Sequence, residues 1–144
     1  PESEALTKAE YEWDTLVLSE GKYRVRVEAS DESVNSPGEA QRHAMESAPF
    51  VVDNTPPTIE ELTLTGRRLK AKVVDRASIV VRVDLALDGR LEWRPLAASD
   101  GVFDEKSEGL DLDVASLVPA GSHLVAVRAF DATGNVTVRE VESR

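Results

Sequence analysis

The chain has 144 residues, of which 41% are hydrophobic and 31% are charged, with a formal net charge of −10 and no cysteine. This composition is typical of a soluble globular protein, and the strong negative charge opposes binding to nucleic-acid phosphates or anionic lipid. Without cysteine there are no disulfides, thiolate metal sites or cysteine nucleophiles, and no apolar run is long enough for a membrane-spanning helix.

The first half of the chain contains few strand signals. Tyr11 and Trp13 flank a charged residue, which predicts a short strand. Between residues 22 and 30 apolar and charged side chains alternate, which predicts a strand with one buried face. The apolar set is Tyr23, Val25, Val27 and Ala29.

Residues 31–47 break this alternation and predict a long hairpin loop. Ser36 and Pro37 are suited to start one helical turn, expected to run through Met45. Residues 48–53 then predict a return strand.

Residues 54–57, Asn-Thr-Pro-Pro, form the predicted boundary between two units, because consecutive prolines favour an extended and fairly stiff connector. We therefore divide the chain into a partial domain, 1–56, and a complete domain, 57–144. Strands are predicted around 59–64, 68–74, 78–87, 91–93, 110–114, 121–131 and 136–141.

Two details of the second unit are specific enough to test. The strand at 78–87 is predicted to place Ile79, Val81, Val83, Leu85 and Leu87 on one face, with Arg82 and Asp84 opposite. Asp88-Gly89 predicts a two-residue type I′ turn.

The two units share a repeated strand. Residues 21–31 and 121–131 coincide at five positions when offset by 100 residues. These pairs are Gly21 with Gly121, Val25 with Val125, Val27 with Val127, Ala29 with Ala129 and Asp31 with Asp131. The chain is therefore expected to be built around one such strand in each unit.

Three segments of the chain resemble known domain families. Residues 18–31 resemble the penultimate strand of fibronectin type III and bacterial immunoglobulin-like domains, and 118–135 resemble the matching strand and hairpin of bacterial immunoglobulin-like repeats. Residues 50–57 resemble the linker between consecutive repeats. The resemblance implies an all-β, Greek-key sandwich fold and a secreted, periplasmic or cell-surface location. It also implies that Tyr23 forms a tyrosine corner with the preceding turn, whereas the second copy has His123 there. There His123 either replaces the corner donor or leaves the corner held by packing alone.

The first unit is predicted to be incomplete. It has about twenty residues before its copied strand, where the second has over sixty. A sheet of two or three strands is marginal alone. We expect its open face (Tyr23, Val25, Val27) to pack on the second unit or on a second copy of the chain.

Candidate chemistry is sparse. Asp53, Asn54, Asp75 and Asp131 are weak calcium candidates, since some sandwich proteins place carboxylates at domain junctions, but Asp in such positions also caps turns. Trp93 and Trp13 alternate with charged residues and are predicted to be core rather than a glycan platform. His43 and His123 are the only histidines, and no catalytic constellation or cofactor site is apparent.

The resulting hypothesis is a non-catalytic structural, spacer or display module of a larger extracellular bacterial protein. The alternative is a binding or adhesion module for protein, glycan or calcium, acting through the 31–47 loop or the junction. An accessory domain of a secreted hydrolase is a third reading. Expected partners are neighbouring domains of the same polypeptide and, through the incomplete unit, another copy of the chain.

Overall fold

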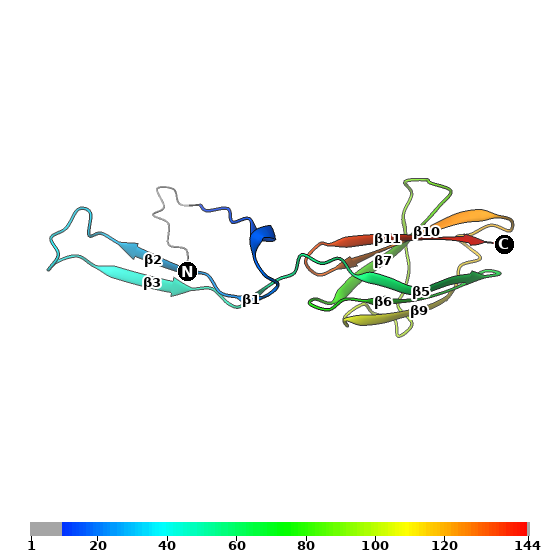
Figure 1. Ribbon diagram of the computed structural model, residues 1–144, viewed down its shortest axis with the longest axis horizontal. Helices are drawn as coiled ribbons and strands as arrows, with labels where there is room; N and C mark the ends of the chain where they lie inside the picture. Colours follow the sequence, from blue (N-terminus) through cyan, green and yellow to red (C-terminus); the bar gives the residue numbers. More distant parts are fainter. Residues whose placement is uncertain (1–9, 144) are drawn as a thin grey trace.

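The computed structural model describes residues 10–143, so residues 1–9 of the predicted first domain lie outside the described part. The chain is all-β, with about 49% strand and several antiparallel sheets, consistent with a β-sandwich. Figure 1 shows two bodies arranged end to end, a long narrow ribbon and a thicker two-layered body, joined by a short connector.

The first unit is a β-ribbon. Its elements are η1 (Thr15–Val17), β1 (Gly21–Tyr23), β2 (Arg26–Ser30), β3 (Arg42–Glu46) and β4 (Phe50–Val52). Strand β1 pairs with β4 and β2 pairs with β3, both antiparallel. Between the two pairs the Ser47 amide donates to the Val25 carbonyl at 2.8 Å, and the Val25 amide donates to Ser47 Oγ at 3.0 Å. The predicted single strand is thus two strands joined at an irregular step.

Three aromatic rings pack together near the base of this ribbon. The Trp13 ring lies edge-on to Tyr23 and to Phe50, with centroids 6.5 Å apart in each pair. The Tyr23 hydroxyl donates to the Ser19 carbonyl at 2.6 Å, which is the back-bond expected of a tyrosine corner. The short strand predicted around Trp13 is wrong, since residues 11–14 form no strand.

The distal loop is shorter than predicted and contains no helix. Residues 42–46, expected in a helical turn, form β3 because β2 offers them a complete antiparallel partner. The amides of Glu39 and Ala40 both donate to the Ser36 carbonyl, so only one tight turn follows Ser36. Asp31 closes the loop, because its Oδ1 accepts from the Gln41 amide at 2.7 Å.

The second unit has two facing sheets. Its strands are β5 (Thr58–Thr65), β6 (Arg68–Val74), β7 (Val80–Leu87), β8 (Arg94–Pro95), β9 (Ser107–Asp113), β10 (His123–Asp131) and β11 (Val136–Ser143). One sheet has the order β5-β6-β9 and the other β11-β10-β7-β8. Their facing apolar side chains form one buried cluster that includes Leu69, Val73, Val83, Leu85, Val125 and Val127. The repeated strand of the second unit, β10, is therefore at the centre of a core.

A bulge in β7 makes the prediction wrong for part of its core-facing side. Phe130 pairs with Arg82 but Asp131 pairs with Val80, which leaves Val81 as an extra residue. An extra residue reverses the alternation of side chains on one side of it. Val81 is consequently 41% exposed, whereas its neighbour Val80 is fully buried. Ile79, also predicted to be on the core face, is 37% exposed for the same reason.

The outer face of the four-stranded sheet carries a buried charge. Asp84 is fully buried and accepts from Nε of Arg82 and of Arg128, each at 2.8 Å. The Arg128 guanidinium lies 4.1 Å from the centroid of the Trp93 ring. Trp93 is thus half-buried on the outer face, and its predicted place in the core is wrong. The two arginines cover Asp84, and the rings of Trp93 and Phe130 lie against the arginines.

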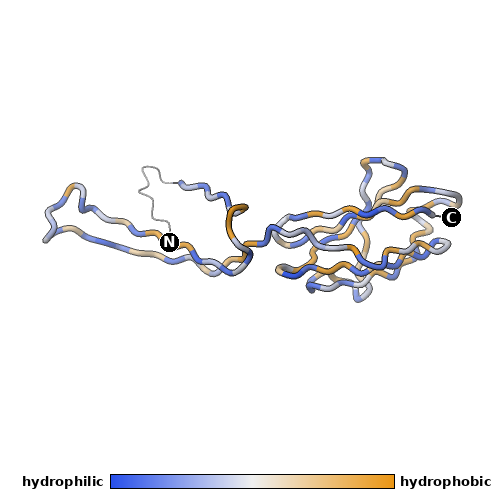
Figure 2. The backbone as a smooth tube through the Cα atoms, viewed as in Figure 1, coloured by the Kyte–Doolittle hydropathy of each residue, from blue (hydrophilic) through white to orange (hydrophobic). Residues whose placement is uncertain are grey.

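The open face of the ribbon does not pack on the second unit. Val27 is 52% exposed, and Met45, which pairs with it on β3, is also exposed. Figure 2 shows hydrophobic positions recurring along the ribbon as well as through the second unit. The expectation that the second unit covers this face is therefore wrong.

Candidate functional site

The connector between the two units, residues 53–57 between β4 and β5, is bonded on both sides. On the first unit, Asn54 Nδ2 donates to the carbonyls of Thr15 and Leu18, at 3.1 and 3.4 Å. The Thr55 hydroxyl donates to the Glu20 carboxylate. These bonds tie the connector to the 3₁₀ turn at the base of the ribbon.

On the second unit, the connector is held by the β10–β11 turn. The Asp53 carbonyl accepts from Asn135 Nδ2 at 2.9 Å and from the Thr133 hydroxyl at 3.3 Å. Pro57 is fully buried at the start of this unit. The connector is therefore a bonded joint and not a free linker.

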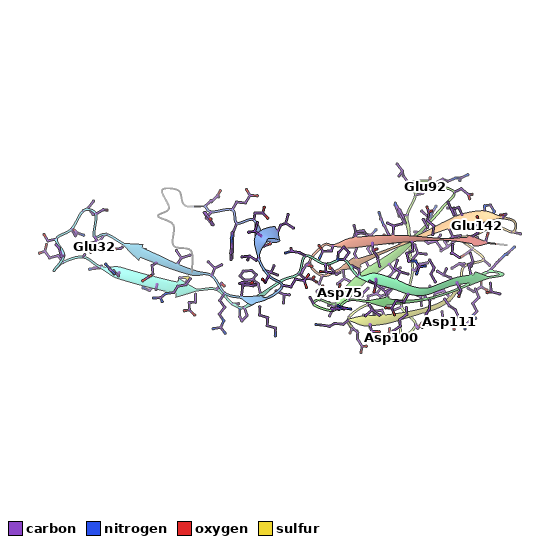
Figure 3. The ribbon with its side chains drawn as sticks, viewed as in Figure 1. Glu32, Asp75, Glu92, Asp100, Asp111 and Glu142 are labelled. Atoms are coloured by element: carbon purple, nitrogen blue, oxygen red, sulfur yellow. The ribbon has the colours of Figure 1, made fainter. Side chains whose placement is uncertain are left out.

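Three carboxylates meet at this joint. Asp53 follows β4, Asp75 follows β6 and Asp131 ends β10. One carboxylate oxygen from each lies within 4.8 Å of the others. All three residues are buried, with exposures of 5%, 5% and 2%. Figure 3 shows Asp75 at the end of the second unit that faces the ribbon.

Each of these aspartates also caps a turn. Asp53 Oδ1 accepts from the Thr55 amide at 3.1 Å. Asp75 Oδ1 accepts from the amide of Ser78 at 2.7 Å, and also from that of Ala77. Asp131 Oδ1 accepts from three donors in its turn, and its Oδ2 accepts from Asn135 Nδ2 at 2.8 Å. The sequence offers turn capping as the alternative to calcium binding for these aspartates. In each of the three, Oδ1 does cap a turn.

The cluster has an unbalanced charge. In residues 10–143 none of the three carboxylates forms an ion pair with a lysine or arginine. Asp53 Oδ2 is buried and has no hydrogen-bond partner in the described part of the chain. Two like charges about 5 Å apart repel by roughly 3 kcal/mol at an effective dielectric constant of about 20. The ionised cluster therefore opposes folding unless something compensates it.

The structure gathers three of the four calcium candidates. Asn54 is the exception, because its side-chain amide turns toward the first unit. The sequence pattern does not mark Thr133 and Asn135 as functional residues, although they hold the connector. Their only local signal is their place in the turn after Asp131. Their bonds to Asp53 span about 80 residues, which no local pattern reveals.

Asn135 has a counterpart in the ribbon. Asn35 Nδ2 donates to Asp31 Oδ2 at 2.7 Å, as Asn135 Nδ2 does to Asp131 Oδ2. The repeat therefore extends beyond the strand into the turn that follows it. In the ribbon this turn lies at the distal tip, where it holds no connector among the described residues.

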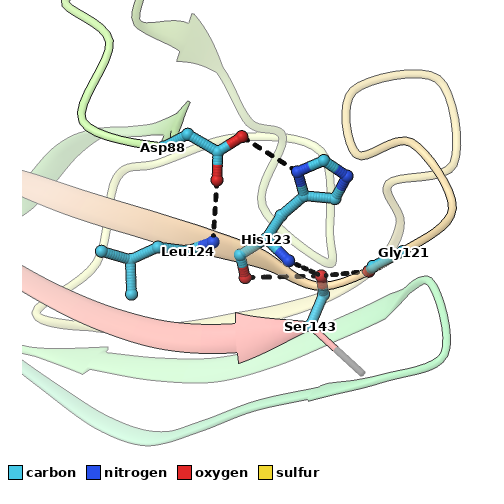
Figure 4. A network of polar contacts seen from close by, with 5 residues as sticks. All are labelled: Asp88, Gly121, His123, Leu124 and Ser143. Atoms are coloured by element: carbon cyan, nitrogen blue, oxygen red, sulfur yellow. Dashed lines mark hydrogen bonds and ion pairs between the residues drawn. The ribbon is translucent and has the colours of Figure 1, made fainter.

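His123 belongs to a separate polar network, shown in Figure 4. Its Nδ1 lies 2.9 Å from Asp88 Oδ2, and the Leu124 amide donates to Asp88 Oδ1 at 3.0 Å. His123 thus bonds to Asp88 in the turn that follows β7. This differs from both sequence expectations, in which His123 either replaces the tyrosine as corner donor or leaves the corner held by packing alone. The hydrogen bond from His123 holds the pKa of the Asp88 carboxyl below its usual value, with the Leu124 amide contributing.

Ser143 is close to this pair but is bonded to the backbone. Its hydroxyl donates to the Gly121 carbonyl at 2.9 Å and accepts from the His123 amide at 2.9 Å. A serine nucleophile needs its hydroxyl bonded to the imidazole of its base. The arrangement of Asp88, His123 and Ser143 instead fastens β10 to β11 and to the β7 hairpin. His43 lies exposed on β3.

A scan against protein-family models found no match, and a search of curated proteins found no significant similarity. Within residues 10–143 no helix has the length and apolar character needed to cross a membrane.

Proposed function

We propose that this chain is a non-catalytic spacer or display module, built from tandem units, that holds neighbouring domains of a larger polypeptide apart. The observation that carries the proposal is the connector bonded to both units through Asn54 and through the Asp53 carbonyl. A joint of this kind fixes the direction of one unit relative to the next, which is what a spacer requires.

We also propose that the second unit has an immunoglobulin-like or fibronectin type III-like fold. Sheets of three and four strands with the orders β5-β6-β9 and β11-β10-β7-β8 are compatible with an immunoglobulin-like or fibronectin type III-like Greek key. The Tyr23–Ser19 hydrogen bond is a further point of likeness. An extracellular location in a bacterium rests on the resemblance to such repeats.

The proposed partner of the ribbon is a neighbouring domain and, for the chain in isolation, a second copy. In the second unit β10 is flanked by β7 and β11, whereas its counterpart β2 is paired only with β3 among the described residues. The exposed side chains of Val27 and Met45 lie on the face left uncovered. Light scattering over a range of concentrations tests this, and a strictly monomeric chain would remove self-association.

The joint is tested by small-angle X-ray scattering or by single-molecule energy transfer between the ribbon tip and the second unit. Asn135→Ala removes the bond to the Asp53 carbonyl and should broaden the distance distribution. Asn35→Ala removes the matching side chain at the distal tip and should leave the distribution unchanged. A wild-type chain as broad as Asn135→Ala would contradict the rigid joint.

The binding alternative keeps one specific observation in its favour. The joint gathers buried carboxylates, and one of their oxygens has no partner among residues 10–143. Carboxylate oxygens are ligands that calcium prefers in proteins.

A further inference from the structure

We propose that Asp53, Asp75 and Asp131 form a binding site for a Ca²⁺ ion at the joint between the two units. This goes beyond the proposed function, because the hydrogen bonds to the connector would hold the joint without an ion. The proposal depends on the span of the oxygens, on their burial and on one oxygen without a donor.

The span of the three oxygens suits calcium. Calcium binds oxygen at about 2.3–2.6 Å, so two ligands on opposite sides of the ion lie up to about 5 Å apart. One oxygen from each aspartate lies within 4.8 Å of the others. Magnesium binds at about 2.0–2.1 Å and demands a near-ideal octahedron, whereas calcium accepts flexible coordination. Calcium is therefore the better fit to three carboxylates that separate turns hold in place.

The Asp53 carboxylate supplies the observation that separates this cluster from an ordinary acidic patch. Its Oδ1 accepts from the Thr55 amide, while its Oδ2 is buried and accepts no hydrogen bond from any described residue. A buried carboxylate oxygen without a donor is costly, and such groups are normally satisfied by a proton donor or a cation. No lysine or arginine pairs with the cluster in residues 10–143, and a bound cation would balance its charge and satisfy this oxygen.

The surrounding turns preorganise these ligands. Asp75 and Asp131 are each fixed through Oδ1 by amides of the residues that follow them. Each carboxylate comes from a different β-strand end, and Asp53 comes from the connector itself. An ion bound by all three would therefore link the connector to both sheets of the second unit.

The first experiment is a calorimetric titration of the EDTA-stripped full chain with CaCl₂. We expect saturable binding of one ion, and Asp53→Asn should weaken it at least about tenfold because it removes one charged ligand. Asparagine keeps an oxygen for the Thr55 amide, so the turn is retained. Asp100→Asn is the matched control, because Asp100 makes the same turn bond, to the Val102 amide at 3.2 Å, with an exposed carboxylate. The control should bind as the wild type does.

The second measurement uses thermal unfolding with CaCl₂ or with EDTA. A ligand that binds only the folded chain raises its melting temperature, and we expect a rise of at least about 3 °C at saturation for the wild type. Asp53→Asn should show a much smaller rise, yet it should melt no lower than the wild type in EDTA, because the substitution relieves repulsion among the carboxylates.

Four results would overturn the proposal. One is the absence of saturable calcium binding by the wild type up to about 10 mM, which is roughly tenfold above the weakest dissociation constants of extracellular calcium modules, about 1 mM. Another is an Asp53→Asn affinity equal to that of the wild type. The third is seen in the NMR spectrum of the ¹⁵N-labelled wild-type chain. There, calcium would shift the amide signals of residues far from Thr55, Ser78 and Thr133. Tighter binding of Mg²⁺ than Ca²⁺ would also refute the choice of ion.

Discussion

The two copies of the repeated strand have nearly the same pattern and opposite environments. Val127 in β10 is fully buried, whereas Val27, its equivalent in β2, is 52% exposed. The alternation of side chains is the same in both and makes both segments strands. Burial, however, depends on a second sheet, which only β10 has among the described residues. Alternation thus specifies a strand and its faces, and the packing partner determines how much stability the strand contributes.

The largest difference expected between the units concerns charge. Asp84→Ala should lower the free energy of unfolding by about 3 kcal/mol, because it leaves Arg82 and Arg128 without their buried partner. Glu46→Ala removes an exposed ion pair with Arg24 in the ribbon and should change stability by less than about 0.5 kcal/mol. Urea unfolding followed by circular dichroism measures both. Equal effects would show that the burial of Asp84 has no energetic weight.

The second comparison substitutes the equivalent valines. Val127→Ala should cost about 2 kcal/mol, from lost burial and the cavity that remains. Val27→Ala should stay within about 0.5 kcal/mol, because its side chain is already half in solvent. The same unfolding experiment measures the pair. A large effect of Val27→Ala in dilute solution would indicate that another chain covers the ribbon.

The third prediction uses the single tryptophan of each unit. In a Trp93→Phe background, fluorescence reports on Trp13 and hence on the aromatic cluster with Tyr23 and Phe50. Tyr23→Phe removes the bond to the Ser19 carbonyl and should destabilise the ribbon locally by about 1 kcal/mol. In a Trp13→Phe background the same substitution should leave the Trp93 transition unchanged. A matching shift of both signals would mean that the two units unfold as one.

The smallest effect concerns acid stability of the second unit. Because the Asp88 carboxyl has a pKa below its usual value of 3.8 in the folded chain, its contribution is present above pH 3.8 and is lost as pH falls through the lower folded pKa. Wild type should therefore be more stable than Asp88→Asn at pH 5, and the difference should shrink below about pH 3. Thermal melts across this range measure it. A difference that grows on acidification would contradict the sign.

Features governed by neighbours in sequence could be predicted. The turn at Asp88-Gly89 has positive φ at both residues, 50° and 71°, as its sequence predicts for type I′. The Tyr23 hydroxyl bonds a residue only four positions away. The buried faces of β6 and β10 follow from their alternation.

Features governed by distant partners could not be predicted. The bulge at Val81 is visible only through the pairing of β7 with β10. Residues 42–46 have no strong strand pattern, and they form a strand because β2 pairs with them. The alternation around Trp93 predicts a core residue, whereas its ring lies against Arg128 on the outer face of the sheet. Of the candidate site, the sequence could provide the aspartates but not their meeting point, which three separate strand ends create.

The direction of the strands has a mechanical consequence. Strands β1 and β4 pair at the base of the ribbon, beginning with Gly21 and Val52. A pull between these two residues therefore separates the strands one residue pair at a time. In the second unit β5 starts beside the connector, and β11 runs alongside β5 to the opposite end, where the described chain finishes. A pull between the start of β5 and the end of β11 acts along both strands and must slide them past each other. Under tension the ribbon should therefore yield first and lengthen, while the second unit keeps its fold.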